Sequence, residues 1–427
     1  MTSAADAPRR LRRLSRIAGA IAMTVGLAGC NLFGPGWSSV HADGSNSDYS
    51  PVAGPTRLAL AWQKTFAGRI NLGPTVDREG RVYVTTGTAT CPLHALDGAT
   101  GAELWCSSEV NQFAAMSSPV IDVDGRVFLA DSVAMHAFDH DGKVLWETPI
   151  KGVPLSAQLT PNGRVVFITN IGVVYVLRRE DGAAVLPPYE LIPGATFDPS
   201  KVSACGLGTA DCPVANTPSV DLETGTISFT FWAPGAAQAS LRAMRISEGP
   251  TPTLTALWTN DSLPGGSASS PDLSADGTRI YVNDNAGAIH ALDAATGRSI
   301  WSFPIGYAPF GSQSTSPQGL LMPAGGIGSP LLAVQDDGDH GTLRWKRTDL
   351  QNRGIPTQTA GGRSYATISA GGQLNDLVVV DTATGAELDR APLPGTSIFS
   401  VGTTVGQDGT VLVPTINGHL YAYRAPA

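Results

Sequence analysis

One short sequence recurs along this chain of 427 residues. Four copies are HALDGATGAELW (94–105), HAFDHDGKVLW (136–146), HALDAATGRSIW (290–301) and VVVDTATGAELD (378–389). Copies at intervals near forty residues are typical of repeat folds, in which each unit packs against its neighbours because none can bury its apolar face alone. The repeat therefore predicts a fold built from like modules.

Each repeat has the pattern of four short antiparallel strands. Two runs rich in Val, Ile, Tyr and Phe flank a Gly-containing turn, as in GPTVDREGRVYVTT (73–86) and SSPDLSADGTRIYVND (269–284), and this pattern indicates a hairpin. The Ala-Leu-Asp piece supplies a third strand, and a fourth strand ends at or near a tryptophan in most copies. Four strands in about forty residues predict a β-propeller blade.

The fourth strands predict an all-β propeller of eight four-stranded antiparallel blades. They end at positions 62, 105, 146, 186, 258, 301, 345 and 388. The strand at 58–66 has no strands before it, whereas 403–425 supplies three strands without a fourth. We expect the two chain ends to close the last blade together, because this leaves no free sheet edge. A seven-bladed alternative requires that the degenerate unit at 312–345 is not a blade.

The pattern Ala-Leu-Asp-x-x-Thr-Gly-x-x-x-Trp resembles the PQQ-like repeat of quinoprotein-type propellers, and the resemblance covers residues 44–425. The stretch Asn46–Pro51 is similar to the start of quinoprotein dehydrogenases. The resemblance includes a non-enzymatic lipoprotein branch, to which the propeller lipoprotein of the outer-membrane Bam assembly complex belongs. It implies that tryptophans dock between neighbouring blades, and here these are Trp62, Trp105, Trp146, Trp258, Trp301 and Trp345.

The N-terminal residues predict export and lipid attachment. Five arginines precede an uncharged apolar stretch at 17–28, and a basic region followed by a short apolar region is typical of a signal peptide. The sequence Leu-Ala-Gly-Cys that ends at Cys30 resembles the bacterial lipobox, which implies diacylglycerol and palmitate on this cysteine. The alternative is an ordinary signal peptide with an incidental cysteine. We expect a lipid-anchored protein on the extracytoplasmic side of the bacterial cell membrane or envelope.

These features define the expected domains. We expect a signal peptide over 1–29 and a lipidated tether over 30–57, because the tether range is rich in Gly, Ser, Pro and Asn and has no strand or helix periodicity. One propeller domain follows over 58–427, with an insertion at about 187–215.

Four cysteines remain besides Cys30, and disulfides persist in the compartments that exported proteins reach. Cys91 and Cys106 flank the turn of one hairpin, and Cys205 and Cys212 bracket a short loop. The predicted pairs are therefore Cys91–Cys106 and Cys205–Cys212. Four cysteines allow three connectivities, and the other two stay open.

Three histidines raise the hypothesis of a metal site. His94, His136 and His290 occupy the same register in three repeats, where Tyr175 and Tyr421 stand in two others. Equivalent positions of different blades are spread around a ring, whereas a metal site needs ligands that converge. We therefore interpret these histidines as structural and expect no metal.

Charge and acidic motifs narrow the function classes further. The net charge of −8, with no Lys/Arg cluster in the predicted propeller, argues against nucleic-acid binding. The acidic turns at 122–125, 139–142 and 336–339 lack the closing Glu of a calcium loop, so we interpret them as ordinary turns. Only 336–339 stays a candidate for an incidental cation.

The sequence carries no recognisable enzyme motif. Quinoprotein dehydrogenases of this fold stack their cofactor against a disulfide of adjacent cysteines and hold calcium with Glu, Asn and Asp, but this chain has no adjacent cysteines. We therefore expect no cofactor. A hydrolase is not expected either, because the Gly-x-Ser-x-Gly elbow is missing and the serine pairs 117–118 and 269–270 recur as blade openings.

These observations favour a protein-interaction scaffold in the cell envelope. A propeller offers loops on two faces and a central depression, which suit protein or peptide partners. The expected partners are envelope proteins or peptides, the membrane through the lipid on Cys30, and no nucleic acid. Two alternatives stay open: a PQQ-dependent dehydrogenase, and a small-ligand binding or sensor propeller with 187–215 as a lid.

Overall fold

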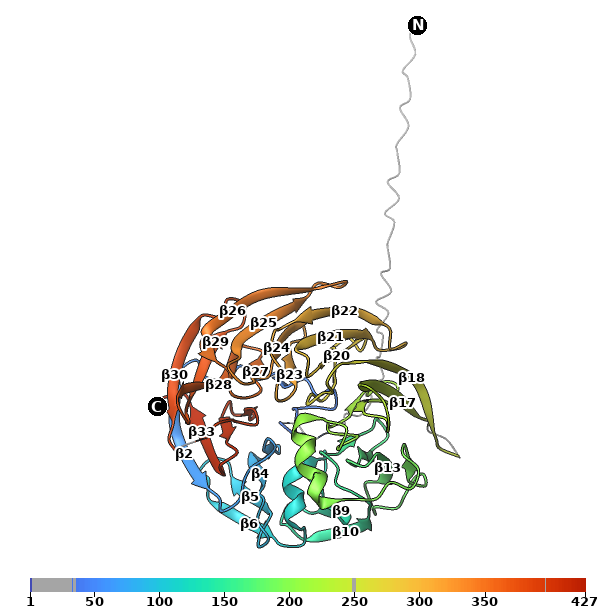
Figure 1. Cartoon of the computed structure of the whole chain (residues 1–427). Helices are drawn as coiled ribbons and strands as arrows, with labels where there is room; N and C mark the ends of the chain where they lie inside the picture. The colour runs from blue at the N-terminus through green and yellow to red at the C-terminus, as the bar shows by residue number, and fades with distance from the viewer. Residues whose placement is uncertain (2–32, 34–35, 248–250, 396) are drawn as a thin grey trace.

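The computed structural model describes residues 1, 33, 36–247, 251–395 and 397–427. Eight blades of four antiparallel strands surround a central axis (Figure 1), and the sheet of one blade has a fifth strand. This is the all-β, eight-bladed propeller that the sequence predicts. The predicted signal peptide and Cys30 lie outside the described residues, so their assignment stays a prediction.

The first four blades follow one another along the chain. Blade 1 contains β3 (Thr75–Val76), β4 (Arg81–Thr85), β5 (Leu93–Asp97) and β6 (Glu103–Ser107). Blade 2 contains β7 (Val120–Ile121), β8 (Val127–Ala130), β9 (Ala134–Phe138) and β10 (Val144–Pro149). Blade 3 contains β11 (Gln158–Leu159), β12 (Arg164–Ile168), β13 (Val173–Arg178) and β14 (Tyr189–Glu190). Blade 4 contains β15 (Ser219–Val220), β16 (Thr226–Phe231), β17 (Ala239–Ser247) and β18 (Thr253–Leu263).

The other four blades complete the ring. Blade 5 contains β19 (Asp272–Leu273), β20 (Arg279–Asn283), β21 (Ala288–Asp293) and β22 (Ser299–Pro304). Blade 6 contains β23 (Gln313–Thr315), β24 (Leu320–Pro323), β25 (Pro330–Asp336) and β26 (Gly341–Gln351). Blade 7 contains β27 (Thr357–Thr359), β28 (Arg363–Gly371), β29 (Leu374–Asp381) and β30 (Glu387–Leu393). Blade 8 contains β31 (Thr404–Val405), β32 (Val411–Pro414), β33 (His419–Arg424) and β2 (Ala59–Thr65).

Both predictions about the count and closure of the blades are confirmed. The degenerate unit forms blade 6, and β2 pairs with β33 in an antiparallel register that runs from Ala59 opposite Arg424 to Thr65 opposite His419. The fourth strand of blade 3 is interrupted. Beside the predicted Leu186, Ala184 forms a bridge with Leu177 and Val185 donates its N–H to Val176, and β14 begins only at Tyr189. Two prolines separate these positions, and proline cannot donate a hydrogen bond to a sheet.

Tryptophans of the fourth strands join each blade to the next. Five of the six donate the indole N–H to a backbone carbonyl in the turn between the third and fourth strands of the following blade, over 2.8 to 3.0 Å. Trp301 donates instead to the carboxylate of Asp336, the last residue of β25 before that turn, over 3.1 Å. The recurring glycine of that turn has a positive φ, and an added Cβ would lie 2.6 Å from Trp62 at Gly101 and 2.3 Å from Trp258 at Gly297. The repeat therefore needs its glycine for both backbone conformation and room.

The apolar core is divided into layers between neighbouring blades. One layer joins Leu320 and Leu331 of blade 6 to Ala366 and Val378 of blade 7. A blade inside the ring is covered on both faces, so its middle strands are largely buried, and every residue of β9 is buried. In the part of the chain that the structure describes, no helix has the length and apolar character needed to cross a membrane.

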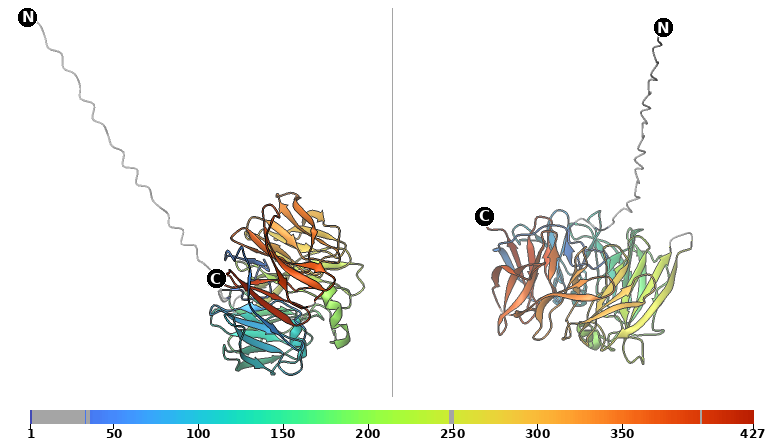
Figure 2. Two further views of the ribbon diagram at one scale, coloured as in Figure 1. Left: turned by 90° about the vertical axis from the view of Figure 1, so that its left-hand side faces the viewer. Right: turned by 90° about the horizontal axis from the view of Figure 1, so that it is seen from above.

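The connections between strands divide the propeller into two faces, because antiparallel strands alternate in direction. The turn face carries the connections between the first and second and between the third and fourth strands of each blade. The loop face carries the second-to-third connections and the connections between blades, including the 3-10 helices η1 (Gln112–Met116) and η2 (Pro199–Leu207). Figure 2 shows η2, in green, on one side of the ring.

Residues 36–57, which the sequence assigns to the tether, lie inside the propeller and are named the central segment. Their backbone and side chains bond to the first strands of seven blades in turn. Val76 donates its N–H to the carbonyl of Trp37, Val220 to that of Gly44, and Thr315 to that of Ser47. The other contacts are those of Ile121 with Ser38, Gln158 with Asn46, Leu273 with Ser45, and Gln358 with Asp48.

The prediction of a tether over 30–57 is therefore wrong for residues 36–57, which are part of the folded propeller. Trp37 is buried, and β1 (Tyr49–Ser50) pairs with β27 in parallel register as a fifth strand of blade 7. The first strand of a blade has an unpaired edge toward the axis, and buried N–H groups must find acceptors. A segment rich in polar and small residues supplies those acceptors, and this explains how a linker-like composition can be buried.

Candidate functional site: a cavity on the loop face

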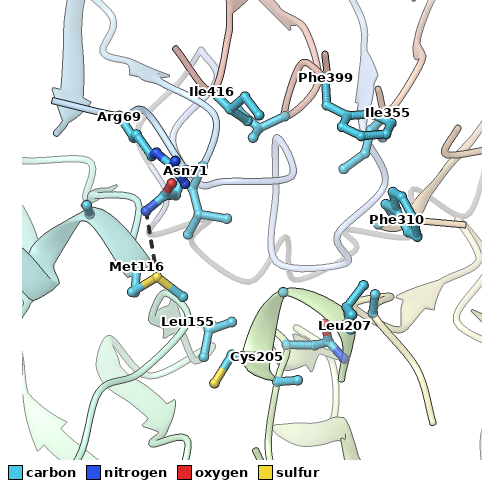
Figure 3. A pocket seen from close by; sticks show the side chains of 18 of the residues that line it. Arg69, Asn71, Met116, Leu155, Cys205, Leu207, Phe310, Ile355, Phe399 and Ile416 are labelled. Carbon is cyan, nitrogen blue, oxygen red and sulfur yellow. Dashed lines mark hydrogen bonds between the residues drawn. The ribbon is translucent and has the colours of Figure 1, made fainter. Parts of the chain in front are cut away.

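A cavity of about 650 Å³ opens at the centre of the loop face. Figure 3 shows its walls, with Met116 and Leu155 on one side and Phe310, Ile355 and Phe399 on another. The lining comes from connections between blades, which the ring directs toward the axis. This cavity is the central depression that the fold predicts.

The lining of the cavity is apolar with a positive charge. Two arginines, Arg69 and Arg353, line the cavity and carry its positive charge. No Asp or Glu is among the described residues that line it. The Arg353 guanidinium lies 5.7 Å from the ring centre of Phe399 and donates to the Ser369 hydroxyl. The cavity therefore differs in charge from the acidic chain as a whole.

The predicted insertion forms one wall of the cavity. Helix η2 begins after Asp198, whose side chain accepts from the N–H of Ser200 over 2.9 Å. Its last residues, Cys205 to Leu207, line the cavity, and Cys205 is bonded to Cys212 with a Cα–Cα distance of 5.1 Å. The disulfide thus holds this wall to the body of the loop.

The floor of the cavity contains a hydrogen-bonded chain of three buried residues. His41 Nδ1 lies 2.8 Å from Asp48 Oδ2, and His41 Nε2 lies 3.0 Å from Ser270 Oγ. The N–H of Thr217 donates to the same hydroxyl oxygen over 3.2 Å. His41 and Asp48 belong to the central segment, whereas Ser270 opens blade 5, so these hydrogen bonds join the central segment to the ring.

Carboxyl groups gather below this floor. Burial raises the pKa of Asp48, against the opposing effect of His41, and burial also raises the pKa of Asp43, against its hydrogen bonds to Ser47. Burial raises the pKa of Asp272 well above its usual range, and this group accepts a hydrogen bond from the Thr315 hydroxyl. The three acids lie where the central segment meets the ring, and each is costly to ionise there.

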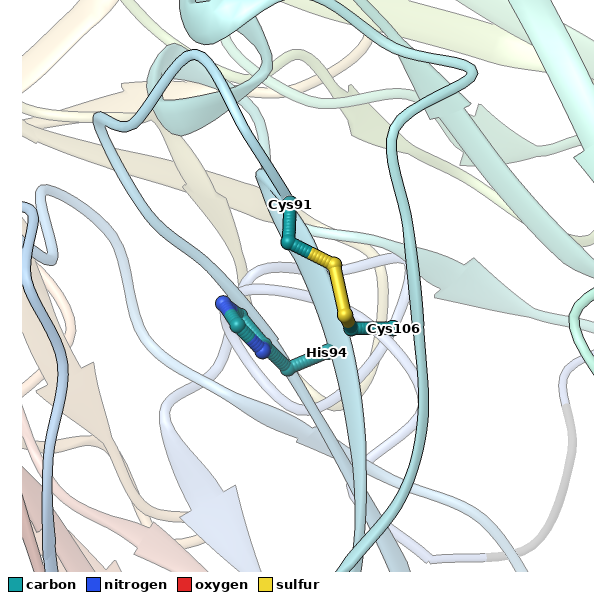
Figure 4. A group of neighbouring side chains, drawn as sticks. All are labelled: Cys91, His94 and Cys106. Atoms are coloured by element: carbon teal, nitrogen blue, oxygen red, sulfur yellow. A yellow bond between two sulfur atoms is a disulfide. The ribbon is translucent and has the colours of Figure 1, made fainter.

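The second disulfide lies in blade 1, away from the cavity lining. Cys91 and Cys106 are bonded, with a Cα–Cα distance of 5.7 Å, so both predicted pairings are confirmed. Figure 4 shows His94 beside this disulfide, and these three residues are the one cluster with metal-ligand spacing in the described part of the chain. Thiolates bind metals, and sulfurs bonded to each other do not supply them.

The structure keeps the three register-equivalent histidines apart. His94 contacts Glu103 over 3.0 Å, and burial, as the largest effect, lowers the pKa of this histidine. His290 contacts Asp284 over 2.6 Å in blade 5, and His136 lies in blade 2. Their partners are residues of their own blades, as expected for structural positions.

The acidic turns are paired with arginines. Arg179 donates to Asp122 over 2.8 Å and to Asp124 over 2.9 Å. Arg279 donates to both carboxylate oxygens of Asp336 over 2.8 Å. In the turn at 336–339, which was the remaining candidate for a cation site, the carboxylate of Asp336 is thus already paired with an arginine.

Local sequence patterns do not identify the residues that form the cavity. They place His41 and Asp48 in a tether and Ser270 at a blade opening, and they single out neither Arg69 nor Arg353. No local pattern identifies the floor, because Ser270 and His41 are 229 residues apart. A histidine and an aspartate within a polar segment were the available signal.

A family model for the outer membrane protein assembly factor BamB matches residues 56–187 and 251–426. The chain belongs to this family of propellers. A relative, Protein Rv3035 of Mycobacterium tuberculosis, is 30% identical over 398 residues, which cover 91% of this chain and 95% of the relative. The BamB of Yersinia pestis is 25% identical over 336 residues, which cover 75% of this chain and 72% of that protein.

Solved structures show the same fold. The crystal structure of BamB from Moraxella catarrhalis has a TM-score of 0.61 at 16% identity and covers 86% of this chain and 99% of that one. Quinohemoprotein alcohol dehydrogenase from Comamonas testosteroni has a TM-score of 0.64 at 16% identity and covers 92% and 82%. The cavity residues do not fit the quinoprotein site, because the described lining has no carboxylate to hold calcium and the chain has no adjacent cysteines.

Proposed function

We propose that this protein is an exported, lipid-anchored scaffold of the cell envelope that binds protein partners with its loop face. Membership in the BamB family supports the proposal, since relatives of this family are described as outer membrane protein assembly factors. The partners would be envelope proteins or peptides, as a scaffold role requires.

The distribution of exposed apolar side chains is the observation that carries this proposal. Large hydrophobic residues that are exposed in the described connections all belong to the loop face: Val133, Leu207, Ile327, Leu374 at the start of β29, and Ile398. The others, apart from Met1, lie on fourth strands at the rim. Exposed apolar groups gathered on one face are typical of a protein-binding surface.

The position of Phe33 also supports the loop face as the face that binds partners. Phe33 forms a β-bridge with Asp122, in the turn between the first and second strands of blade 2, so the chain enters the ring from the turn face. Phe33 is three positions after Cys30, which is at most about 11 Å along an extended chain. A lipid on Cys30 would hold the turn face near the membrane and leave the loop face free for partners.

Site-specific photo-crosslinking in cells tests the proposed face. Ile327 is 79% exposed on the loop face, and Leu257 is an exposed rim residue of β18 that serves as the matched control. A photo-reactive phenylalanine at Ile327 should give adducts with envelope proteins, and the same residue at Leu257 should give far fewer. Equal adducts from both positions, or none from Ile327, would contradict the proposal.

Lipid attachment is tested separately with an alkyne analogue of palmitate. The wild-type chain should incorporate the analogue and sediment with membranes, and the C30S variant should do neither. Labelling of C30S at the level of the wild type would show that Cys30 carries no lipid. This outcome would leave the loop-face proposal to the crosslinking result.

A further inference from the structure

Two blades open with the same Ser-Ser-Pro sequence, but their second serines have different environments. The N–H of Ser118 donates to the Ser156 hydroxyl, and the N–H of Ser270 donates to the Ser312 hydroxyl, so the backbones are equivalent. Ser118 Oγ donates to the carbonyl of Gly73 over 2.7 Å. Ser270 Oγ instead lies 3.0 Å from a histidine nitrogen, His41 Nε2.

The contacts of His41 determine which nitrogen can accept a proton. Asp48 lies against Nδ1, and the ionised form of this carboxyl group, which His41 favours against the effect of burial, holds the hydrogen on Nδ1 and leaves the lone pair on Nε2. Ser270 Oγ then donates its hydrogen to Nε2 and accepts from the N–H of Thr217. This order of serine, histidine and aspartate is the arrangement that activates a serine nucleophile, and it is recognised by geometry on unrelated folds.

The cavity gives a substrate access to two of the three residues. Ser270 and His41 line it, whereas Asp48 lies behind His41 and does not. The walls are mostly aliphatic and aromatic, and their fixed charges are those of Arg69 and Arg353. A neutral or anionic molecule with an apolar chain fits this lining, and a cationic one does not.

We propose that the loop-face cavity hydrolyses carboxylic esters with an apolar acyl chain. Ser270 is the nucleophile, His41 is the general base and acid, and Asp48 is a positioning residue that orients His41. The missing Gly-x-Ser-x-Gly elbow does not oppose this assignment, because that elbow belongs to a different fold.

The reaction balances with water as the second substrate. Ser270 Oγ forms a bond to the ester carbonyl carbon while its proton moves to His41 Nε2. The bond from the carbonyl carbon to the leaving oxygen breaks, and that oxygen takes the proton from Nε2 and departs as an alcohol. Water then gives a proton to Nε2 and attacks the acyl-serine, which releases a carboxylic acid and restores the Ser270 hydroxyl.

Covalent labelling of the full chain is the first test. A fluorophosphonate probe reacts with activated serines, so the wild-type protein should carry an adduct that peptide mass spectrometry places on Ser270. The S118A variant, altered at the equivalent serine outside the cavity lining, should label as the wild type does. Wild-type protein without an adduct at Ser270 would overturn the proposal, and this readout needs no variant to fold.

Ester hydrolysis is the second test, with p-nitrophenyl octanoate and p-nitrophenyl acetate as probes. The wild-type and S118A proteins should prefer the octanoate, and S270A should lose at least a hundredfold in kcat. In D48N, kcat should fall by about a thousandfold while KM changes by less than about threefold, since the residue orients His41 without lining the cavity. Equal rates in S270A and S118A proteins of similar Tm would overturn the proposal.

Discussion

The ring of blades and the central segment are both buried, but they are held by different interactions. The ring is stabilised by apolar layers between blades and by tryptophans that dock on the following turn. The central segment packs Trp37 and Ala42 into one apolar cluster, but it bonds its own polar groups to the first strands of seven blades. Local sequence patterns are therefore enough to form the ring of blades, whereas the axis of the ring is filled by a segment that resembles none of the repeats.

The largest expected effect tests whether the central segment belongs to the core. Trp37 is 1% exposed in the central segment, and Trp62 is 8% exposed in the ring. We expect W37A and W62A each to lower the free energy of unfolding by about 3–5 kcal/mol, as removal of a buried aromatic ring does. The measurement is guanidinium unfolding, with the exposed Leu104→Ala as control. A loss below about 1 kcal/mol in W37A would mean that the central segment contributes little.

A smaller effect is expected at the glycines of the ring. Gly297 has φ +70° and an added Cβ would meet Trp258 at 2.3 Å, whereas Gly277 has the same φ with nothing near. G277A should cost about 1 kcal/mol from backbone strain, and G297A about 2–4 kcal/mol because the tryptophan must also move. Unfolding curves of both variants decide this. Equal losses would show that docking adds no constraint at this turn.

Removal of either disulfide should lower the free energy of unfolding, and the two losses should differ by less than those of the two glycine variants. One closes 15 residues in blade 1 and the other closes 7 in the cavity wall. Loss of Cys91–Cys106 in the double serine variant should cost about 3 kcal/mol and loss of Cys205–Cys212 about 2 kcal/mol, from the entropy of the unfolded chain. Only the second should open η2 to limited proteolysis. Cleavage of η2 in both variants would contradict a local role.

The smallest effect concerns acids between ring and central segment. Burial raises the pKa of Asp272, so the folded protein binds this proton more tightly than the unfolded chain. The contribution to stability is present below the usual value near 3.8 and is lost as pH rises through the folded pKa. In D272N, the Tm should therefore decrease less, relative to the wild type, between pH 4 and pH 7.

An exposed turn of the same blade is the control. A hydrogen bond from Ser274 lowers the pKa of Asp276, so its contribution has the opposite sign and is lost as pH falls. D276N should change the Tm difference between pH 4 and pH 7 in the opposite direction. A shift of the same sign in both variants would contradict the burial argument for Asp272.

Local patterns allowed much of the ring to be predicted. The blade count, the closure by β2 and β33, and both disulfides follow from hairpin periodicity and from cysteines close in sequence. The interruption of the fourth strand of blade 3 was not predicted. Residues 184–185 pair with β13 near the predicted Leu186, but two prolines separate them from β14. Composition misassigned residues 36–57, since solvated and buried polar segments have similar residues.

The sequence by itself determined a ring of eight blades, because each blade is encoded in about forty consecutive residues. Only the tertiary structure decided what fills the axis and what forms the cavity. The bond between His41 and Ser270 joins residues 229 positions apart, and it forms where the central segment meets the start of blade 5. Backbone N–H groups on the inner strand edges need acceptors once water is excluded, and this need places the central segment where it lies.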